Sequence, residues 1–218
     1  MNIVLDIGNT RIKTGFYSDY ELIETKSFSE KISIELLEII WKEANADSSI
    51  VSSTAQLPEN IKEWLMMKEA MMFSSSTPIP VTLDYKTPKT LGRDRIAGTI
   101  AANHIFPKNP CLVIDLGTCI TYDLINEQKI YQGGAISPGM KMRFQAMNSF
   151  TGRLPLIEKP EFITENGHST TESLNKGVMS GIVHEINGFV RSYTQKYNNL
   201  KVILTGGDAS LFEQHIEN

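Results

Sequence analysis

Two short stretches of the sequence combine an aspartate with glycine and small polar residues directly after an apolar run. The first is Asp6-Ile-Gly-Asn-Thr10, which follows Ile3-Val4-Leu5, and the second is Asp115-Leu-Gly-Thr-Cys119, which follows Leu112-Val113-Ile114. A glycine lets the backbone approach a phosphate and present its N–H groups, and asparagine or threonine adds neutral donors. The aspartate would repel a phosphate, so it would act through Mg²⁺ or its water shell. Each stretch is therefore suited to a polyphosphate.

The second stretch repeats the first about half the chain length later, and each is expected to join two strands. Such repetition indicates a duplicated domain with a site between its halves. Two ordinary turns that are alike by chance are the alternative, because aspartate and glycine are common turn residues. Lys13, on the strand expected after the first turn, could supply positive charge near transferring phosphoryl oxygens.

A third candidate group, Gly92-Arg-Asp-Arg95, opens an apolar helix pattern. A carboxylate between two arginines tends to stay ionised, so Asp94 could orient a substrate alcohol and accept its proton. Arg95 could hold a substrate carboxylate, which the amides of a helix N-terminus also favour. The alternative is that Asp94 caps the helix and that the two arginines are solvated.

A glycine pair lies near the end of the chain, in Thr205-Gly-Gly-Asp208, after the apolar residues Val202-Ile203. A strand-to-helix turn of this kind can let a flat adenine lie against the backbone, and an ordinary tight turn is the alternative. The sequence contains no GxxxxGK[ST] P-loop and no GxGxxG fingerprint after a strand, so the common nucleotide-binding folds gain no support.

The elements that must position these residues alternate between strand and helix patterns. Strands are expected over residues 2–7, 11–17, 21–28, 50–52, 81–84, 112–115, 120–125 and 202–204. Helices are expected over residues 32–44, 59–70, 94–106, 140–148 and 171–196. Strands and helices mixed in this order indicate an α/β protein.

Composition narrows the classes of function. The net charge of −4 is spread along the chain, so neither nucleic acid nor an anionic membrane is expected as a partner. The sequence has no basic leader and no long apolar run. Cys111 and Cys119 are expected to be buried thiols in a reducing cytoplasm, and the scattered histidines form no zinc motif.

Taken together, these features resemble the type III pantothenate kinases, which belong to the superfamily of sugar kinases, acetate kinase, actin and Hsp70. The resemblance covers almost the whole chain in order, and the combination is more specific than any one motif. It rests on Asp6-x-Gly-Asn-Thr10, Tyr85, Gly92-Arg-Asp-Arg95, Asp115-x-Gly-Thr118-x-x-Thr121, Gly133-Gly-Ala-Ile-Ser-Pro-Gly139, Thr170 and Thr205-Gly-Gly-Asp208.

The resemblance implies two ribonuclease-H-like (actin-like ATPase) halves, residues 1–110 and 111–218, with the active site in the cleft between them. It implies a cytoplasmic homodimer that transfers the γ-phosphate of ATP to pantothenate in the first step of coenzyme A synthesis. Mg²⁺ would accompany ATP, and a monovalent cation, K⁺ or NH₄⁺, would be required.

The resemblance also assigns residues to roles. Asp94 would be the proton acceptor, Asp115 would bind the monovalent cation, and Asp6 would hold Mg²⁺ directly or through water. The residues implied for ATP are Asp6, Ile7, Gly8, Asn9, Thr10, Arg11, Ile12, Lys13 and Thr118. The residues implied for pantothenate are Tyr85, Gly92, Arg93, Asp94, Arg95 and Thr170.

Two departures from the family pattern stand out. Cys119-Ile120 replaces the small or hydroxyl residues that are usual in the second turn. The chain also ends soon after the glycine pair, so it is expected to be either a naturally short member or one that lacks its C-terminal part. Two alternatives stay open: a non-catalytic accessory or regulatory relative that binds ATP, and a kinase for another small alcohol.

Overall fold

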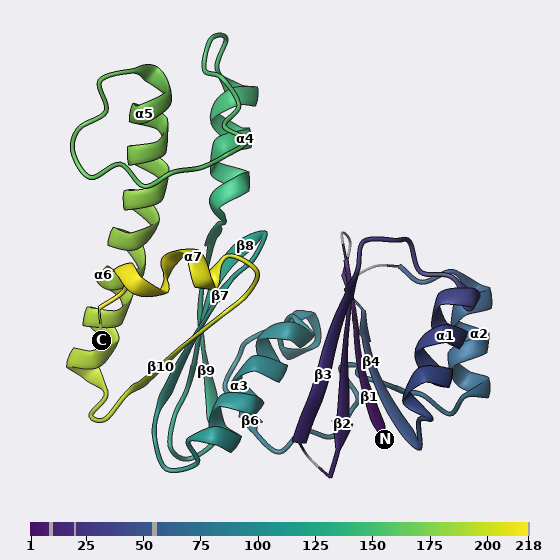
Figure 1. The fold of residues 1–218 in the computed structure, drawn as a ribbon. Coiled ribbons are helices and arrows are strands. Elements are labelled where there is room, and N and C mark those ends of the chain that lie inside the picture. The colour runs from purple at the N-terminus through teal and green to yellow at the C-terminus, as the bar shows by residue number, and fades with distance from the viewer. Residues whose placement is uncertain (9–10, 20, 54–55, 218) are drawn as a thin grey trace. The chain divides into compact units, whose positions relative to one another are not determined.

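The part of the chain that the structure describes contains two mixed sheets of five strands each (Figure 1). The structure is a computed structural model and describes residues 1–8, 11–19, 21–53 and 56–217. These residues divide into two compact units, each with one sheet. Unit 1 is Met1–Ile79 with Thr87–Asp94, and unit 2 is Pro80–Lys86 with Arg95–Asn218.

The sheet of unit 1 has the strand order β3-β2-β1-β4-β5. Its first three strands form an antiparallel meander, and β4 and β5 add in parallel beyond β1. The strands are β1 (Asn2–Ile7), β2 (Ile12–Ser18), β3 (Glu21–Phe28), β4 (Ser48–Ser53) and β5 (Met71–Met72).

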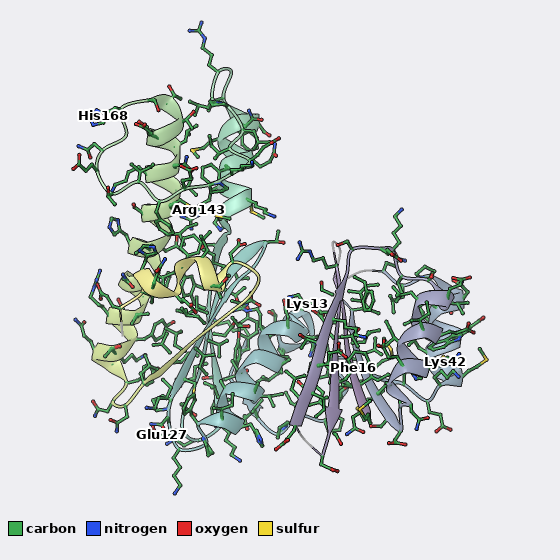
Figure 2. All side chains as sticks on the ribbon, viewed as in Figure 1. Lys13, Phe16, Lys42, Glu127, Arg143 and His168 are labelled. Carbon is green, nitrogen blue, oxygen red and sulfur yellow. The ribbon has the colours of Figure 1, made fainter. Side chains whose placement is uncertain are left out.

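One face of this sheet carries the core of unit 1. Alternate residues of β1, among them Ile3 and Leu5, are buried against α1 (Ile34–Ala44) and α2 (Glu59–Met67). Phe16 of β2 belongs to the same core (Figure 2). Because side chains alternate across a strand, Asp6 and Lys13 lie on the opposite face of the sheet.

The sheet of unit 2 has the strand order β10-β7-β8-β9-β6. It again begins with an antiparallel meander, and β10 pairs in parallel with its first strand, β7. The strands are β6 (Thr82–Leu83), β7 (Cys111–Leu116), β8 (Cys119–Ile125), β9 (Ile130–Pro138) and β10 (Lys201–Thr205). The order β3-β2-β1-β4 thus recurs as β9-β8-β7-β10, as the predicted duplication requires.

Helices cover both faces of this second sheet (Figure 1). α3 (Arg93–Ile105) packs on one face through Ala102, against Cys111 and Val113 of β7. The alternate residues of β7 pack on the other face, against α6 (Gly181–Lys196). α4 (Met140–Phe150) and α5 (Thr170–Asn175) extend beyond the sheet, and α5 runs into α6 through the π-helical turn Lys176–Ser180 (Figure 1).

The predicted α/β class is confirmed, and most elements lie within a few residues of their predicted ranges. The predicted helix 171–196 contains a π-helical turn, and the short strand β5 was not predicted. β9 was also not predicted; its Gly133-Gly134 pair is unusual within a strand. The remaining elements are the 3-10 turns η1 (Pro88–Thr90) and η3 (Glu213–His215) and the helix α7 (Ala209–Phe212).

Among the helices that the structure describes, none is long and apolar enough to cross a membrane. Both cysteines are free thiols; Cys111 is buried, whereas Cys119 is half-buried.

Candidate active site

The first Asp-x-Gly turn joins β1 to β2 and sets an aspartate beside a lysine. Asp6 and Lys13 are directly paired across the two strands, which puts their side chains on one face. The amide of Gly8 donates to the carbonyl of Arg11 over 3.0 Å, and a Cβ on Gly8 would lie 3.1 Å from that carbonyl oxygen. Ile7 and Ile12 are buried, whereas Arg11 is exposed. Asn9 and Thr10, predicted to contact ATP, lie outside the described residues.

Asp94 lies close enough to Asp6, within unit 1, to influence its ionisation. Burial raises the pKa of Asp6, Lys13 lowers it, and the carboxylate of Asp94 raises it again. Asp94 itself is exposed in the first turn of α3. Asp6 and Lys13 of the first hairpin therefore come together with Asp94 of α3, which is far away in sequence. Two neighbouring carboxylates favour a bound cation.

The two arginines beside Asp94 are engaged with other groups. The guanidinium of Arg93 donates to the carbonyls of Pro88 and Lys89, each over 3.3 Å. These bonds tie the start of α3 to the segment that precedes it, which includes Gly92. Arg95 forms a buried ion pair with Asp123 of β8 through Nε (2.8 Å) and Nη2 (2.7 Å). Arg95 would therefore meet a substrate as half of an ion pair rather than as a solvated cation.

Asp123 is the centre of a buried polar cluster in unit 2 that the sequence analysis did not identify. Its side chain is almost fully buried, and it also accepts a hydrogen bond from the hydroxyl of Tyr131, over 2.8 Å. The ring of Tyr85 lies 5.8 Å from that of Tyr131, at an interplanar angle of 60°. A signal was available in the sequence, since Asp123 interrupts the otherwise apolar end of β8, Tyr122 to Ile125.

The second Asp-x-Gly turn, between β7 and β8, is packed tightly by two other glycine turns. The amide of Gly139 donates to the carbonyl of Thr118 over 3.1 Å, and a Cβ on Gly139 would lie 2.3 Å from the carbonyl oxygen of Gly117. A Cβ on Gly206, whose φ is +98°, would lie 2.4 Å from Oδ1 of Asp115. Three predicted motifs thus meet at one corner of unit 2, and no larger residue fits where they touch.

A second polar network, also missed in the sequence, holds this corner from the side of the helices. Glu185 of α6 accepts hydrogen bonds from Tyr122 (2.7 Å) and Ser137 (2.5 Å) and pairs with Arg143 over 2.5 Å. Arg143, at the base of α4 in Figure 2, also donates to the carbonyl of Pro138 over 2.8 Å. Burial raises the pKa of Glu185, but its three donors outweigh that effect and lower it overall. The network therefore fixes the Ser137–Gly139 segment against the second turn.

Thr170 lies apart from the other substrate residues of unit 2. It is exposed in the first turn of α5, and Ser169 caps that helix. α5, the π-helical turn and α6 follow one another as one helical rod. Near the other end of this rod lies Tyr193, whose pKa is raised by burial and, in addition, by the charge of Asp123. At about 1.5 Å per residue the two are separated by roughly 35 Å. Figure 2 shows His168, two residues before Thr170, near the end of α4 and α5 that is remote from Arg143.

The structure thus gathers the predicted residues into four places. Asp6, Lys13 and Asp94 lie together in unit 1. In unit 2, Tyr85 and Arg95 share the Asp123 cluster, Asp115 and Thr118 share the glycine-lined corner, and Thr170 is remote from both. Among the described residues, no three histidine, cysteine, aspartate or glutamate side chains form a metal-binding group.

Comparison with known proteins identifies the family. Residues 2–192 match the family model for type III pantothenate kinase. A type III pantothenate kinase from Cytophaga hutchinsonii is 40% identical over 217 residues, covering 100% of this chain and 91% of the relative.

Solved structures share the fold at lower identity. A putative Baf family transcriptional activator from Campylobacter jejuni is 20% identical with a TM-score of 0.60, covering 99% of this chain and 88% of that one. A putative N-acetylmannosamine kinase from Listeria monocytogenes is 15% identical with a TM-score of 0.51, covering 98% and 87%. These two similarities show the fold alone. The family model, in contrast, covers residues 2–192, and the Cytophaga hutchinsonii relative is 40% identical. The chain belongs to the type III pantothenate kinase family.

Proposed function

We propose that this protein transfers the γ-phosphate of ATP to the hydroxyl of pantothenate, giving 4′-phosphopantothenate in the first step of coenzyme A synthesis. The observation that carries the proposal is the grouping of Asp6, Lys13 and Asp94 within unit 1 of a chain from this family. A cytoplasmic location is consistent with two free thiols in a reducing compartment.

Asp94 accepts the proton of the attacking hydroxyl. Its exposure lets a substrate reach it, and its position at the start of a helix holds it on a rigid element. The pantothenate pocket is formed with it by Gly92, Arg93, Tyr85 and Arg95. Removal of the proton as the phosphoryl group arrives leaves an oxygen that bonds to phosphorus while ADP departs.

The phosphates of ATP bind along the first turn. The backbone at Gly8 and the ammonium of Lys13 face them, with Thr118 of the second turn as a further contact. In this proposal the duplicated halves, residues 1–110 and 111–218, enclose the site in a cleft. The tight contacts of Gly139 and Gly206 keep the second turn rigid, which supports such a role.

Two cations complete the site. Asp94 already disfavours the charged form of Asp6, so anionic phosphates beside the pair call for Mg²⁺, held by Asp6 directly or through water. The carboxylate of Asp115, lined by Gly117 and Gly206, is the proposed ligand for K⁺ or NH₄⁺. When bound, these ions neutralise charge on the phosphates during transfer.

One assay tests the function and its alternatives. ADP release is measured with ATP and Mg²⁺, with and without pantothenate, and the product is identified by mass spectrometry. Release that depends on pantothenate supports the proposal. Release only with another alcohol would favour a different kinase, and ATP binding without release would favour a non-catalytic relative.

We also propose a homodimer in which Thr170 of each chain completes the pantothenate pocket of the other. Thr170 lies roughly 35 Å along the helical rod from the level of the Asp123 cluster, too far to reach its own chain's Tyr85 and Arg95. Gly177, Gly181 and Gly188 line one side of that rod. Apart from the backbone of the helix itself, a Cβ added at any of them would meet no described atom within 4 Å, which leaves space for close packing by a second chain.

Mixing two inactive variants tests the shared pocket. Asp94→Asn and Thr170→Arg chains are mixed under conditions that allow subunit exchange, and heterodimers should regain activity because one pocket draws both intact residues from different chains. The control mixes Asp94→Asn with the double variant, which should stay inactive. A monomer by sedimentation, or no recovery despite proven exchange, would contradict the dimer.

A further inference from the structure

The ion pair between Arg95 and Asp123 is the most deeply buried ion pair among the described residues of unit 2. Arg95 is 9% exposed and Asp123 only 1%. Burying a charge is costly unless the charge is paired, and in a medium of low dielectric the two partners stabilise each other. Asp123 therefore stabilises Arg95 in the place where it lies.

The geometry of the pair sets the direction of the guanidinium. Nε donates to Oδ1 of Asp123 over 2.8 Å, and Nη2 lies 2.7 Å from the same oxygen as an ion-pair contact. Because the guanidinium is planar with its five N–H donors in a rigid fork, two contacts along one edge set the direction of the other edge. Arg95 thus enters any substrate complex already oriented.

The same oxygen of Asp123 also orients an aromatic pair. The hydroxyl of Tyr131 donates to it over 2.8 Å, and the Tyr85 ring packs on the Tyr131 ring. Gly133, with φ +80°, lies beneath Tyr85, and a Cβ there would come within 3.6 Å of the ring. A single buried carboxylate thereby holds Arg95 directly and Tyr85 through Tyr131.

We propose that Asp123 and Tyr131 are positioning residues that make the acceptor pocket selective for an alcohol carrying a carboxylate. They fix Arg95 and Tyr85 for that carboxylate without touching the substrate. This inference rests on the proposed function, since it names the part of the same site that selects the substrate. It adds two residues to that site and assigns the selectivity to a buried ion pair.

Tyr131→Phe is the main test, with Tyr122→Phe as the matched control. Both tyrosines are buried in adjacent strands, and each donates a hydroxyl hydrogen bond to a carboxylate that is also paired with an arginine. In Tyr131→Phe the KM for pantothenate should rise about tenfold, as for one lost hydrogen bond to a charged group, with kcat and the KM for ATP nearly unchanged. Tyr122→Phe should leave the KM for pantothenate unchanged.

A second readout compares pantothenate with its neutral analogue, in which an alcohol replaces the carboxylate. The ratio of kcat/KM for the two substrates should fall about tenfold in Tyr131→Phe and further in Asp123→Asn, but stay at the wild-type value in Tyr122→Phe. A general loss of stability would lower both rates and leave this ratio in place. If Asp123→Asn does not fold, Tyr131→Phe alone decides.

The possible results separate the inference from the function on which it rests. If the wild type releases ADP with pantothenate but Tyr131→Phe keeps the wild-type KM and ratio, the positioning role is wrong and the kinase function stands. The same holds if Tyr122→Phe changes them equally. If the wild type shows no turnover that depends on pantothenate, the proposed function fails and the positioning role fails with it.

Discussion

The two sheets repeat one strand order, and their Asp-x-Gly turns share one kind of local hydrogen bond. The amide of Gly8 donates to the carbonyl of Arg11, and the amide of Gly117 donates to the carbonyl of Cys119, each within its own hairpin. The turn of unit 2 is packed in addition by Gly139 and Gly206, which come from distant parts of the chain. The second turn thus adds tertiary packing to the local hairpin geometry that both turns have.

The residue across from the aspartate also differs between the two hairpins. Asp6 pairs with Lys13, whereas Asp115, at the matching position, pairs with Thr121. The same backbone therefore presents a positive charge beside one aspartate and a neutral hydroxyl beside the other. Under the proposed roles, the duplicated scaffold would serve charge neutralisation in unit 1 and a cation or nucleotide contact in unit 2.

The largest effect on turnover is expected at Asp94, the carboxylate of α3 that lies near the first turn. Asp94→Asn should keep ATP binding but lower turnover by about 10²–10⁴-fold, because the proton acceptor is lost. Steady-state kinetics with pantothenate would measure it. Asp19→Asn is the control, since Asp19 is exposed in a hairpin turn with φ +47°, which asparagine tolerates. Near-normal turnover in Asp94→Asn would mean that Asp94 is not the proton acceptor and only stabilises the start of the helix.

The next prediction compares the two cross-strand partners. Lys13→Gln should lower kcat by about 10²-fold, because a charged donor to the phosphoryl oxygens is removed. Thr121→Val removes only a neutral hydroxyl at the matching position, so its loss should stay below about tenfold. Parallel rate measurements on the two variants test this. Equal losses would break the division of roles between the units.

The two strand-ending aspartates should respond differently to monovalent salt. The wild type should be activated by K⁺ or NH₄⁺ over Na⁺ by about tenfold or more, an expectation that rests on the family. Asp115→Asn should bring that ratio close to one, whereas Asp6→Asn should lower the rate and keep the ratio. Rates in the three chlorides at fixed ionic strength measure this. Equal wild-type rates in all three would overturn the monovalent site.

The smallest effects concern stability, where two half-buried carboxylates should behave in opposite ways. Hydrogen bonds lower the pKa of Glu185 below its ordinary 4.5, so its contribution is present above that pH and is lost as the pH falls. Glu185→Gln should therefore lower the free energy of unfolding at pH 7 by about 1–3 kcal/mol, with a smaller difference in acid.

Asp6 should show the reverse. Burial raises its pKa above the ordinary 3.8, so its ionisation costs stability as the pH rises through the folded-state value. Asp6→Asn should be slightly more stable than the wild type at pH 7 in metal-free buffer, and the gain should vanish near pH 3. Thermal unfolding across this pH range tests both carboxylates. A destabilised Asp6→Asn variant would show that Asp6 is already compensated.

Much of this molecule could be predicted because its signals are local. Apolar runs such as Ile3-Val4-Leu5 predicted strands, and the repeated Asp-x-Gly turn predicted the duplication that the strand orders then displayed. β9 was not predicted, and its glycine pair is unusual within a strand. In the sheet, a Cβ on Gly134 would lie 1.5 Å from the carbonyl oxygen of Tyr122, so the glycine is there for close backbone approach.

The sequence by itself determined the family, the α/β class and the candidate aspartates, because residue type and spacing along the chain carry that information. Only the tertiary structure decided which partners those residues meet. It paired Arg95 with Asp123 instead of leaving it solvated, brought Asp94 close to Asp6, and carried Thr170 far along a helical rod. The physical reason is that burial and pairing of charge depend on neighbours contributed by distant segments, and no local pattern encodes them.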